Sequence, residues 1–518
     1  MTKLLPPLVL LTALLFAACG GDDDGHQSVL NRGLATDPES LDPHKARTVQ
    51  AADVLRDIGE GLMSYTATGE LVAGAAQSWE DTADRLQWAF TIREDARWSN
   101  GDKVTAQDFE FSLKRLVDPA TTSFYAQIIE DVVESVTATD ERTLTIRLRR
   151  PTPYFLDLLT HPSTFPIHVP SHESYGDSFA RAGRYVSNGA YVLDTWLPGS
   201  IIILKRNAYY WNNDATAIDV VRHHVVTQEV AELNRYRSGE LHITSVVPPD
   251  GFAQTKETFG DQLRVAPYLG VYYFGFNLTR PPFANNVALR EALSMAIDRE
   301  ALVEKVLGRG ELPAYSWVPP GTWNYEPVRF SYADLSQGER NSIALQRYRD
   351  AGYGEERPLE IELRFNTNDT HKRVALAVSA MWRETLGVET RLINEESSVF
   401  LSNVRQGNVT QVFKGSWIGD FNDAHTFLGV MQGGSSTNMP AYANDEYDAL
   451  MQRAASQVRL DRRRLYLEEA ERVMLADHPV IPLYFYVSKH LVSPQVQGWG
   501  DNVLDYHYSQ HLSLDAAR

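Results

Sequence analysis

The chain of 518 residues has one cysteine, a deficit of positive charge and no long hydrophobic run. One cysteine cannot form an intramolecular disulfide, so cysteine content says little about the compartment. The formal net charge of −18 argues against a nucleic-acid partner, because phosphate binding needs clustered Lys and Arg. No apolar run reaches the roughly 18 residues that a membrane-spanning helix needs. Hydrophobic residues at 43% and charged residues at 22% are nevertheless typical of a folded globular protein.

The sequence also lacks the common motifs of catalysis and phosphate binding. It contains no GxxxxGK[ST] loop, no GxGxxG after an expected strand, no HExxH and no GxSxG. The histidines do not cluster at metal-ligand spacing, and the adjacent His223 and His224 are expected on opposite faces of a strand, one in the core and one at the surface. We therefore expect no catalytic residue, no metal site and no cofactor. A carboxylate pair for glycoside hydrolysis stays open, because Asp and Glu are abundant.

The N-terminal segment has the pattern of a secretion signal. Lys3 supplies the positive start, residues 8–16 supply a short apolar core, and small residues precede Cys19. The Gly- and Asp-rich stretch that follows has the composition of a solvated tether. The pattern resembles a bacterial lipoprotein signal, which implies a signal peptide at 1–18 and a tether at 19–27 that is lipid-anchored through Cys19. An ordinary secretion signal with a chance cysteine is the alternative.

Strands and helices alternate through most of the chain, which predicts an α/β fold with mixed sheets. Apolar residues that alternate predict strands, and apolar residues three or four positions apart predict helices. The expected strands cover 29–34, 86–92 and 144–148. The expected helices cover 50–62, 288–297, 301–307 with Gly308 as its C-cap, 374–386 and 446–475. A further helix is expected to begin at the N-cap pair Thr105 and Asp108.

Aromatic residues are numerous and gather in short stretches at 268–274, 417–421 and 484–486. Such groups more often belong to a core than to a site. The stretch 414–423 differs, because it combines small residues, Trp417 and the carboxylate of Asp420. Glycines let a ligand approach the backbone, and a partly buried carboxylate needs a cation. On these residues alone, a surface turn after a strand remains the alternative to a binding site.

Several ordered blocks resemble the family 5 extracellular solute-binding proteins of ABC transporters. They lie at 71–80, 90–109, 188–191, 206–211, 289–299 and 312–316, and the likeness extends from about Ser28 to the C-terminus. Residues 40–45 and 417–422 are most similar to the oligopeptide-binding branch. The resemblance implies a two-lobed periplasmic-binding-protein type II fold with an extra third domain. The implied limits are 28–59, 171–269 and 488–518 for a discontinuous domain I, 60–170 for domain II and 270–487 for domain III.

The same resemblance implies a receptor and not an enzyme. Such a protein closes its lobes on an oligopeptide and delivers it to the permease of an ABC transporter in the cytoplasmic membrane. It would be a monomer in the periplasm or at the outer face of the cytoplasmic membrane, held there only by its lipid anchor. Murein peptides, dipeptides and nickel chelates are rival solutes within the family. A secreted hydrolase and a purely structural surface protein are the rivals from other classes.

The residues that would hold a peptide follow from the matched positions. The resemblance implies that the peptide backbone bonds to two strand edges, and that Asp420 pairs with the α-ammonium, which needs a fixed negative partner once desolvated. At position 414 the branch has arginine, so lysine there loses bidentate pairing with a carboxylate. The implied edges are Arg47, Thr48 and Val49 on one side and Ser416, Trp417 and Ile418 on the other; the implied aromatic lining is Tyr125, Tyr273 and Tyr486, and the implied partners of the C-terminal carboxylate are His371, Arg405 and Lys414.

Overall fold

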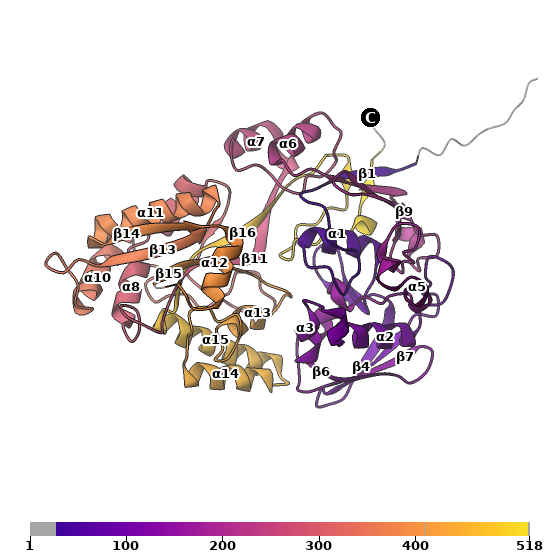
Figure 1. The fold of residues 1–518 in the computed structure, drawn as a ribbon, viewed down its shortest axis with the longest axis horizontal. Helices are drawn as coiled ribbons and strands as arrows, with labels where there is room; N and C mark the ends of the chain where they lie inside the picture. The colour runs from indigo at the N-terminus through magenta and orange to yellow at the C-terminus, as the bar shows by residue number, and fades with distance from the viewer. Residues whose placement is uncertain (1–26, 410, 516–518) are drawn as a thin grey trace, which may run out of the picture.

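The computed structural model describes residues 27–409 and 411–515, which form two lobes (Figure 1). Cys19 and the signal segment lie outside the described residues. Two long antiparallel strands, β11 (Leu263–Phe276) and β16 (Val480–Leu491), extend from one lobe into the other. The described helices include none that is both long and apolar enough to cross a membrane. The molecule combines helices with mixed sheets, so the α/β prediction is confirmed.

The first lobe contains a four-stranded sheet in the order β1 (Val29–Leu34), β10 (Val220–Val225), β9 (Ile201–Arg206) and β8 (Tyr191–Leu197). Strand β1 is parallel to β10, and the other pairs are antiparallel. Helix α1 (Val49–Ile58) packs its apolar face on this sheet and begins at Thr48, whose side chain accepts a hydrogen bond from the Ala51 amide. On β10, His223 is buried and His224 is partly exposed, as expected for adjacent strand residues.

A second sheet in the same lobe is entirely antiparallel, in the order β4 (Ala76–Asp81), β5 (Gln87–Ile92), β7 (Thr143–Leu148) and β6 (Val133–Ala138). Helix α2 (Ala106–Val117) shares its core, with Phe109 and Leu113 facing the sheet. Thr105 and Asp108 form a reciprocal capping box at the start of α2, which confirms the predicted N-cap pair.

The second lobe is built on a six-stranded mixed sheet in the order β12 (Leu312–Pro313), β16, β11, β15 (Val412–Ile418), β13 (Glu360–Asn366) and β14 (Glu389–Glu395). Its helices are α8 (Val287–Met295), α10 (Gln337–Asp350), α11 (Asp369–Leu386), α12 (Ser397–Arg405), α14 (Asp445–Ala455) and α15 (Leu460–Asp477). The helical stretch expected at 446–475 is thus two helices. The helix expected at 301–307 is a π-helical turn, Leu302–Leu307, that ends at Gly308 with φ of 65°.

Shorter elements connect these layers. Two small sheets are formed by β2 (Met63–Tyr65) with β3 (Leu71–Ala73) and by β17 (Val496–Gln497) with β18 (Ser513–Leu514). The short helices are α3 (Ala126–Glu130), α4 (Phe155–Leu158), α5 (Val169–Tyr175), α6 (Glu229–Arg237), α7 (Phe252–Phe259), α9 (Arg299–Ala301) and α13 (His425–Leu428). Single turns of helix lie at Pro119–Thr121, Pro162–Thr164, Gly176–Ala180, Asn213–Ala215, Gly260–Gln262, Gly429–Met431 and Ser509–His511. The three-domain limits predicted from the sequence stay a prediction.

Candidate functional site

Strand β15 presents an open backbone edge near the junction of the lobes. It pairs with β11 along its whole length, from Val412 opposite Phe276 to Ile418 opposite Gly270. On its other side β13 pairs only with Val412 and Phe413. Within the described chain, residues 414–418 therefore have a strand partner on one side only. An extended ligand backbone would find unpaired N–H and C=O groups there, which is the geometry of strand addition.

Asp420 follows this open edge and has no partner for its charge. Its backbone N–H donates to Thr426 Oγ1 at 3.1 Å, which fixes the turn. No described residue hydrogen-bonds to or forms an ion pair with its carboxylate, although water still reaches the side chain. The residue is exposed to solvent, but the surrounding protein partly desolvates its carboxylate and raises the pKa of Asp420 to about 6. A desolvated carboxylate without a cation is a site that an incoming ammonium group would stabilise.

The Asp420 carboxylate borders a cavity of about 420 Å³ that lies between the two lobes. Trp417 and Phe421 line it from the second lobe, and Gln127 and Tyr154 line it from the first. The rings of Phe421 and Tyr154 stack at 4.3 Å with an angle of 8°, so the lobes are in contact beside Asp420. The buried indole N–H of Trp417 has no hydrogen-bond partner within the described residues. The cavity therefore offers an unpaired N–H donor and a carboxylate, and it has room for a side chain of a bound molecule.

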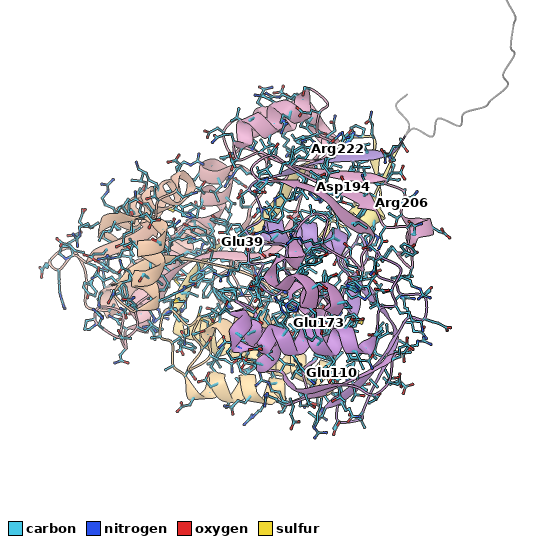
Figure 2. All side chains as sticks on the ribbon, turned by 45° about the vertical axis from the view of Figure 1, so that its right-hand side comes forward. Glu39, Glu110, Glu173, Asp194, Arg206 and Arg222 are labelled. Atoms are coloured by element: carbon cyan, nitrogen blue, oxygen red, sulfur yellow. The ribbon has the colours of Figure 1, made fainter. Side chains whose placement is uncertain are left out.

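The first lobe brings Tyr125 and the segment 47–49 to the same place. The Tyr125 hydroxyl donates to the Arg47 carbonyl at 3.5 Å, and burial together with the nearby Asp420 charge raises the pKa of Tyr125 to about 12. Glu39, labelled in Figure 2, accepts hydrogen bonds from the amides of Arg47 and Thr48. This placement makes Tyr125 a close neighbour of Asp420 across the junction between the lobes.

The structure corrects the expectation that Arg47, Thr48 and Val49 form a strand edge. Thr48 is the N-cap of α1, and Val49 is the first residue of that helix. The two amides that precede the helix are already bonded to Glu39, so they are not free for a ligand. The sequence does not show this, because the capping function of Thr48 and the reach of Glu39 depend on the folded loop. Ligand contact at these three residues stays a prediction, through carbonyl oxygens or side chains.

The expected carboxylate-binding end lies at the other end of the open edge. Lys414 Nζ donates to Ser416 Oγ at 3.1 Å and lies 5.4 Å from the centre of the Tyr272 ring. Burial lowers the pKa of Lys414 to about 8, which leaves the ammonium largely charged at pH 7. His371 Nδ1 is 3.3 Å from the Tyr272 hydroxyl, and burial together with the Lys414 charge lowers the pKa of His371 to about 4. At neutral pH the pair thus offers one cation and one neutral imidazole.

The remaining predicted residues, Tyr486, Arg405 and Tyr273, differ in their environments. Tyr486 packs against Tyr484 and Tyr272, and burial raises its pKa to about 12. Arg405 ends α12 and is exposed, so its contact with a ligand stays a prediction. Tyr273 is buried beneath β15 with its ring edge-on to Trp317 at 5.0 Å. In the free protein Tyr273 is therefore a core residue that supports the site and not a lining residue.

The sequence analysis missed one residue of the candidate site and gave another a different role. Tyr272, next to Tyr273, is the ring that contacts both His371 and Lys414. Alternation along a strand shows that the two tyrosines face opposite sides, but it does not show which face holds the site. Gly415 was expected to let a ligand approach the backbone. A Cβ there would lie 2.1 Å from Tyr273 Cζ, so this glycine makes room for a buried ring.

Comparison with known proteins agrees with this geometry. The murein tripeptide-binding protein MppA in its unliganded open form superposes with a TM-score of 0.84 at 33% identity, covering 94% of this chain and 98% of that one. OppA of Haemophilus influenzae in complex with RPPGFSPFR superposes with a TM-score of 0.78 at 33% identity, covering 94% and 99%. The chain thus has the two-lobed fold of the periplasmic binding proteins.

The profile of the bacterial extracellular solute-binding proteins, family 5, middle region, matches residues 70–439. The periplasmic oligopeptide-binding protein OppA of Escherichia coli K12 is 36% identical over 506 residues, which cover 94% of this chain and 93% of that protein. The periplasmic murein peptide-binding protein MppA of the same organism is 35% identical over 502 residues, with 94% and 93% covered. The chain belongs to family 5 of the bacterial extracellular solute-binding proteins, as its sequence blocks had indicated.

Proposed function

We propose that this protein is an extracytoplasmic receptor that captures oligopeptides between its two lobes and delivers them to the permease of an ABC transporter. The observation that carries the proposal is the desolvated, unpartnered carboxylate of Asp420 next to the open edge of β15. The Asp420 carboxylate binds the α-ammonium of a peptide. The open edge of β15 binds the peptide backbone whatever its side chains are. The relatives OppA and MppA, named for oligopeptides and murein peptides, support this substrate class.

The two ends of the site set an approximate ligand length. Lys414 and Asp420 are six positions apart along an extended segment. At about 3.3 Å per residue they are separated by at most roughly 20 Å. A peptide of three to five residues, fully extended at about 3.3–3.6 Å per residue, spans about 10–18 Å. Such a peptide would place its ammonium at Asp420 and its carboxylate near Lys414 and His371.

The proposal is tested by identifying what the protein retains and what stabilises it. Native mass spectrometry of the protein purified without refolding should show co-purified peptides. After these ligands are removed, free tri- to pentapeptides should raise the melting temperature, by a stabilisation of about 2.7 kcal/mol at a concentration of one hundred times Kd. The same melting measurement with a murein tripeptide decides between oligopeptides and murein peptides as substrates. Stabilisation by a bile acid, a sugar or a nickel chelate, with none by any peptide, would overturn the proposal.

The membrane anchor is a separate part of the proposal. The sequence pattern around Cys19 supports a lipidated N-terminus, with the binding fold beginning at about residue 28. Cys19→Ala should release the protein from the membrane fraction, and peptide affinity should not change because the proposed peptide contacts all lie between residues 47 and 486. A processed Cys19→Ala protein that still sediments with membranes would contradict anchoring at this residue.

A further inference from the structure

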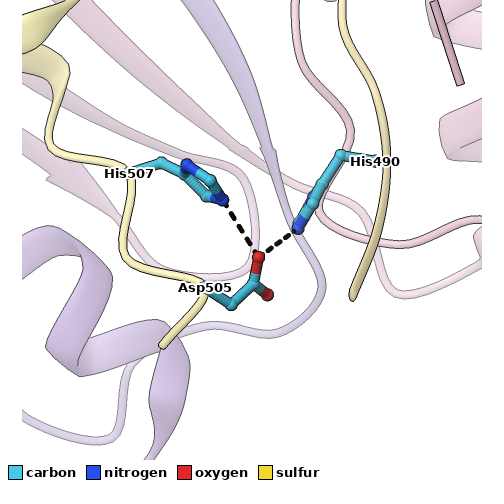
Figure 3. A group of neighbouring side chains, drawn as sticks. All are labelled: His490, Asp505 and His507. Carbon is cyan, nitrogen blue, oxygen red and sulfur yellow. Dashed lines mark hydrogen bonds and ion pairs between the residues drawn. The ribbon is translucent and has the colours of Figure 1, made fainter. Parts of the chain in front are cut away.

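Far from Asp420 in the chain, three metal-ligand side chains converge at the base of the strands that join the lobes. His490 belongs to β16, whereas Asp505 and His507 lie in the C-terminal segment (Figure 3). Asp505 Oδ1 is 2.9 Å from His490 Nε2 and 3.0 Å from His507 Nε2. The three ligand atoms lie within 4.8 Å of one another. Linear spacing did not predict this group, because β16 and the C-terminal segment meet only in the folded protein.

The orientation of His490 is fixed by a second hydrogen bond. His490 Nδ1 is 2.8 Å from the Thr244 carbonyl oxygen, which only accepts, so Nδ1 carries a hydrogen. In the neutral imidazole Nε2 then presents its lone pair, and it faces the carboxylate of Asp505. Two acceptors that face each other need a positive species between them, either a proton on Nε2 or a metal ion. An imidazole whose other nitrogen donates to a backbone carbonyl is the usual outer-shell arrangement of a metal-ligating histidine.

His507 and Asp505 are held equally firmly. The indole of Trp499 stacks on the His507 ring at 3.6 Å and 17°, and the backbone carbonyl of His507 accepts a hydrogen bond of 2.8 Å from Arg32. Asp505 has a left-handed backbone with φ of 57°, a strained conformation for a residue with a side chain. That turn allows two side chains of one short segment to approach His490. The histidine side chains are 12% and 6% exposed and that of Asp505 is 23% exposed, which leaves access for one ion or water.

We propose that His490, Asp505 and His507 form a binding site for one divalent transition-metal ion of the zinc type. Two imidazole nitrogens and one carboxylate oxygen are a donor set suited to Zn²⁺, Co²⁺ or Ni²⁺ and poorly suited to Ca²⁺ or Mg²⁺, which prefer oxygen ligands. A tetrahedral ion with bonds of 2.0–2.1 Å places its ligands roughly 3.3 Å apart. The two spacings that involve Asp505, 2.9 and 3.0 Å, need to widen by a few tenths of an ångström. The two imidazole nitrogens, which lie within 4.8 Å of each other, need to reach the same spacing. Water supplies the fourth ligand.

The position of the site gives it a structural role. His490 pairs with Arg264 of β11, so it lies where both connecting strands enter the first lobe. An ion bound there ties the end of β16 to the C-terminal segment through three side chains that are not among the predicted peptide contacts. Tyr506, between two of these ligands, lies close enough to Asp420 to feel its charge. The two proposals use different side chains and are tested with different variants, so failure of one does not overturn the other.

The experiment uses the full mature chain without an affinity tag, after treatment with chelator. Titration with Co²⁺ should produce the intense visible absorption of a tetrahedral site at one ion per chain, and Zn²⁺ should displace it. Asp505→Asn and His507→Gln should each weaken Zn²⁺ binding by at least about 10–100-fold, because loss of an outer-shell partner alone has that effect. The matched control is His172→Gln, a histidine of α5 outside the cluster, which should bind Zn²⁺ like the unaltered protein.

Two results would overturn the proposal. One is the absence of stoichiometric Zn²⁺ or Co²⁺ binding by the chelator-treated protein, in which case a proton on His490 fills the space. The other is binding that Asp505→Asn and His507→Gln leave unchanged. If those variants fold poorly, anomalous diffraction from crystals of the unaltered protein soaked in Zn²⁺ decides the question. The proposal requires a peak between these three side chains.

Discussion

Asp420 and Asp423 lie three positions apart after β15, and the fold gives them opposite environments. Asp423 is 1% exposed, and its two oxygens accept from Arg463 Nη1 and Nη2 at 2.7 and 2.8 Å. It also accepts a hydrogen bond of 2.8 Å from the His425 amide. Asp420 has no such partner, and partial desolvation raises its pKa to about 6. One carboxylate is therefore satisfied within the protein, and the other is left for a ligand.

The comparison shows that the absence of an internal partner, and not depth of burial, marks the binding residue. Asp423 is buried and paired, whereas Asp420 is exposed and gains stability when a ligand supplies a cation. Asp423 keeps the loop in place, because it joins the segment after β15 to helix α15 through Arg463. Asp420 then has a fixed position from which to bind. Substitution of each aspartate in turn can therefore distinguish the effect of Asp423 on stability from the effect of Asp420 on peptide binding.

The largest effect on stability is expected for Asp423→Ala. The substitution leaves the guanidinium of Arg463 buried without its carboxylate, which should lower the free energy of unfolding by about 3–5 kcal/mol. Urea denaturation at neutral pH measures this loss. The matched control is Asp461→Ala, which removes an exposed carboxylate paired with Arg459 and should lower the stability far less, because exposed ion pairs contribute little. Equal losses in the two variants would contradict a structural role for Asp423.

For Asp420→Asn we expect the converse, a loss of binding without a loss of stability. The bound ammonium would be left without a counter-charge in the closed protein, which costs about 3–5 kcal/mol, so peptide affinity should fall by a factor of about 10² to 4 × 10³. Calorimetric titration with a free tripeptide measures it.

N-acetylated tripeptide should bind the unaltered protein with a comparable loss of affinity, because it lacks the ammonium group. The two losses should not add, since both remove one interaction. Strictly additive losses, or an unchanged affinity of Asp420→Asn, would show that Asp420 does not hold the amine.

A smaller effect is expected for Gly415→Ala. This substitution leaves both carboxylates in place and changes the packing beneath the open edge of β15. The new methyl group would overlap Tyr273, whose ring is confined by Trp317. Overpacking of this kind should destabilise the protein by about 1–3 kcal/mol and weaken peptide binding through displacement of β15. Gly338→Ala in α10 is the control, because its Cβ meets no neighbour within 4 Å and should be neutral or slightly stabilising. Thermal unfolding of both variants provides the comparison.

The smallest expected effect is the change of peptide affinity with pH. In the free protein Asp420 is protonated below pH about 6, and binding of an ammonium must expel that proton. Affinity should therefore be constant between about pH 6 and the amine pKa of about 8, and should fall by up to about tenfold per unit below pH 6. Asp420→Asn should abolish the acid limb. An acid limb that persists in this variant would assign the titration to another group.

Several features of this protein could be predicted from the sequence because they depend on local interactions. The strand 29–34 and the capping box of Thr105 and Asp108 follow from side-chain alternation and from hydrogen bonds within one turn. The family followed from ordered blocks along the chain, and the blocks also indicated Asp420. None of these inferences requires knowledge of which distant segments meet.

The tertiary structure decided what each of these residues does. Asp423 pairs with Arg463, whereas Asp420 has no partner. Residues 47–49 form the start of a helix, and two of the amides there are bonded to Glu39. Tyr272, and not Tyr273, lies beside Lys414 and His371. The fold also brings His490 to Asp505 and His507. In each case the deciding partner lies on another element, and the distance between elements is set by packing of the whole core, which no local pattern encodes.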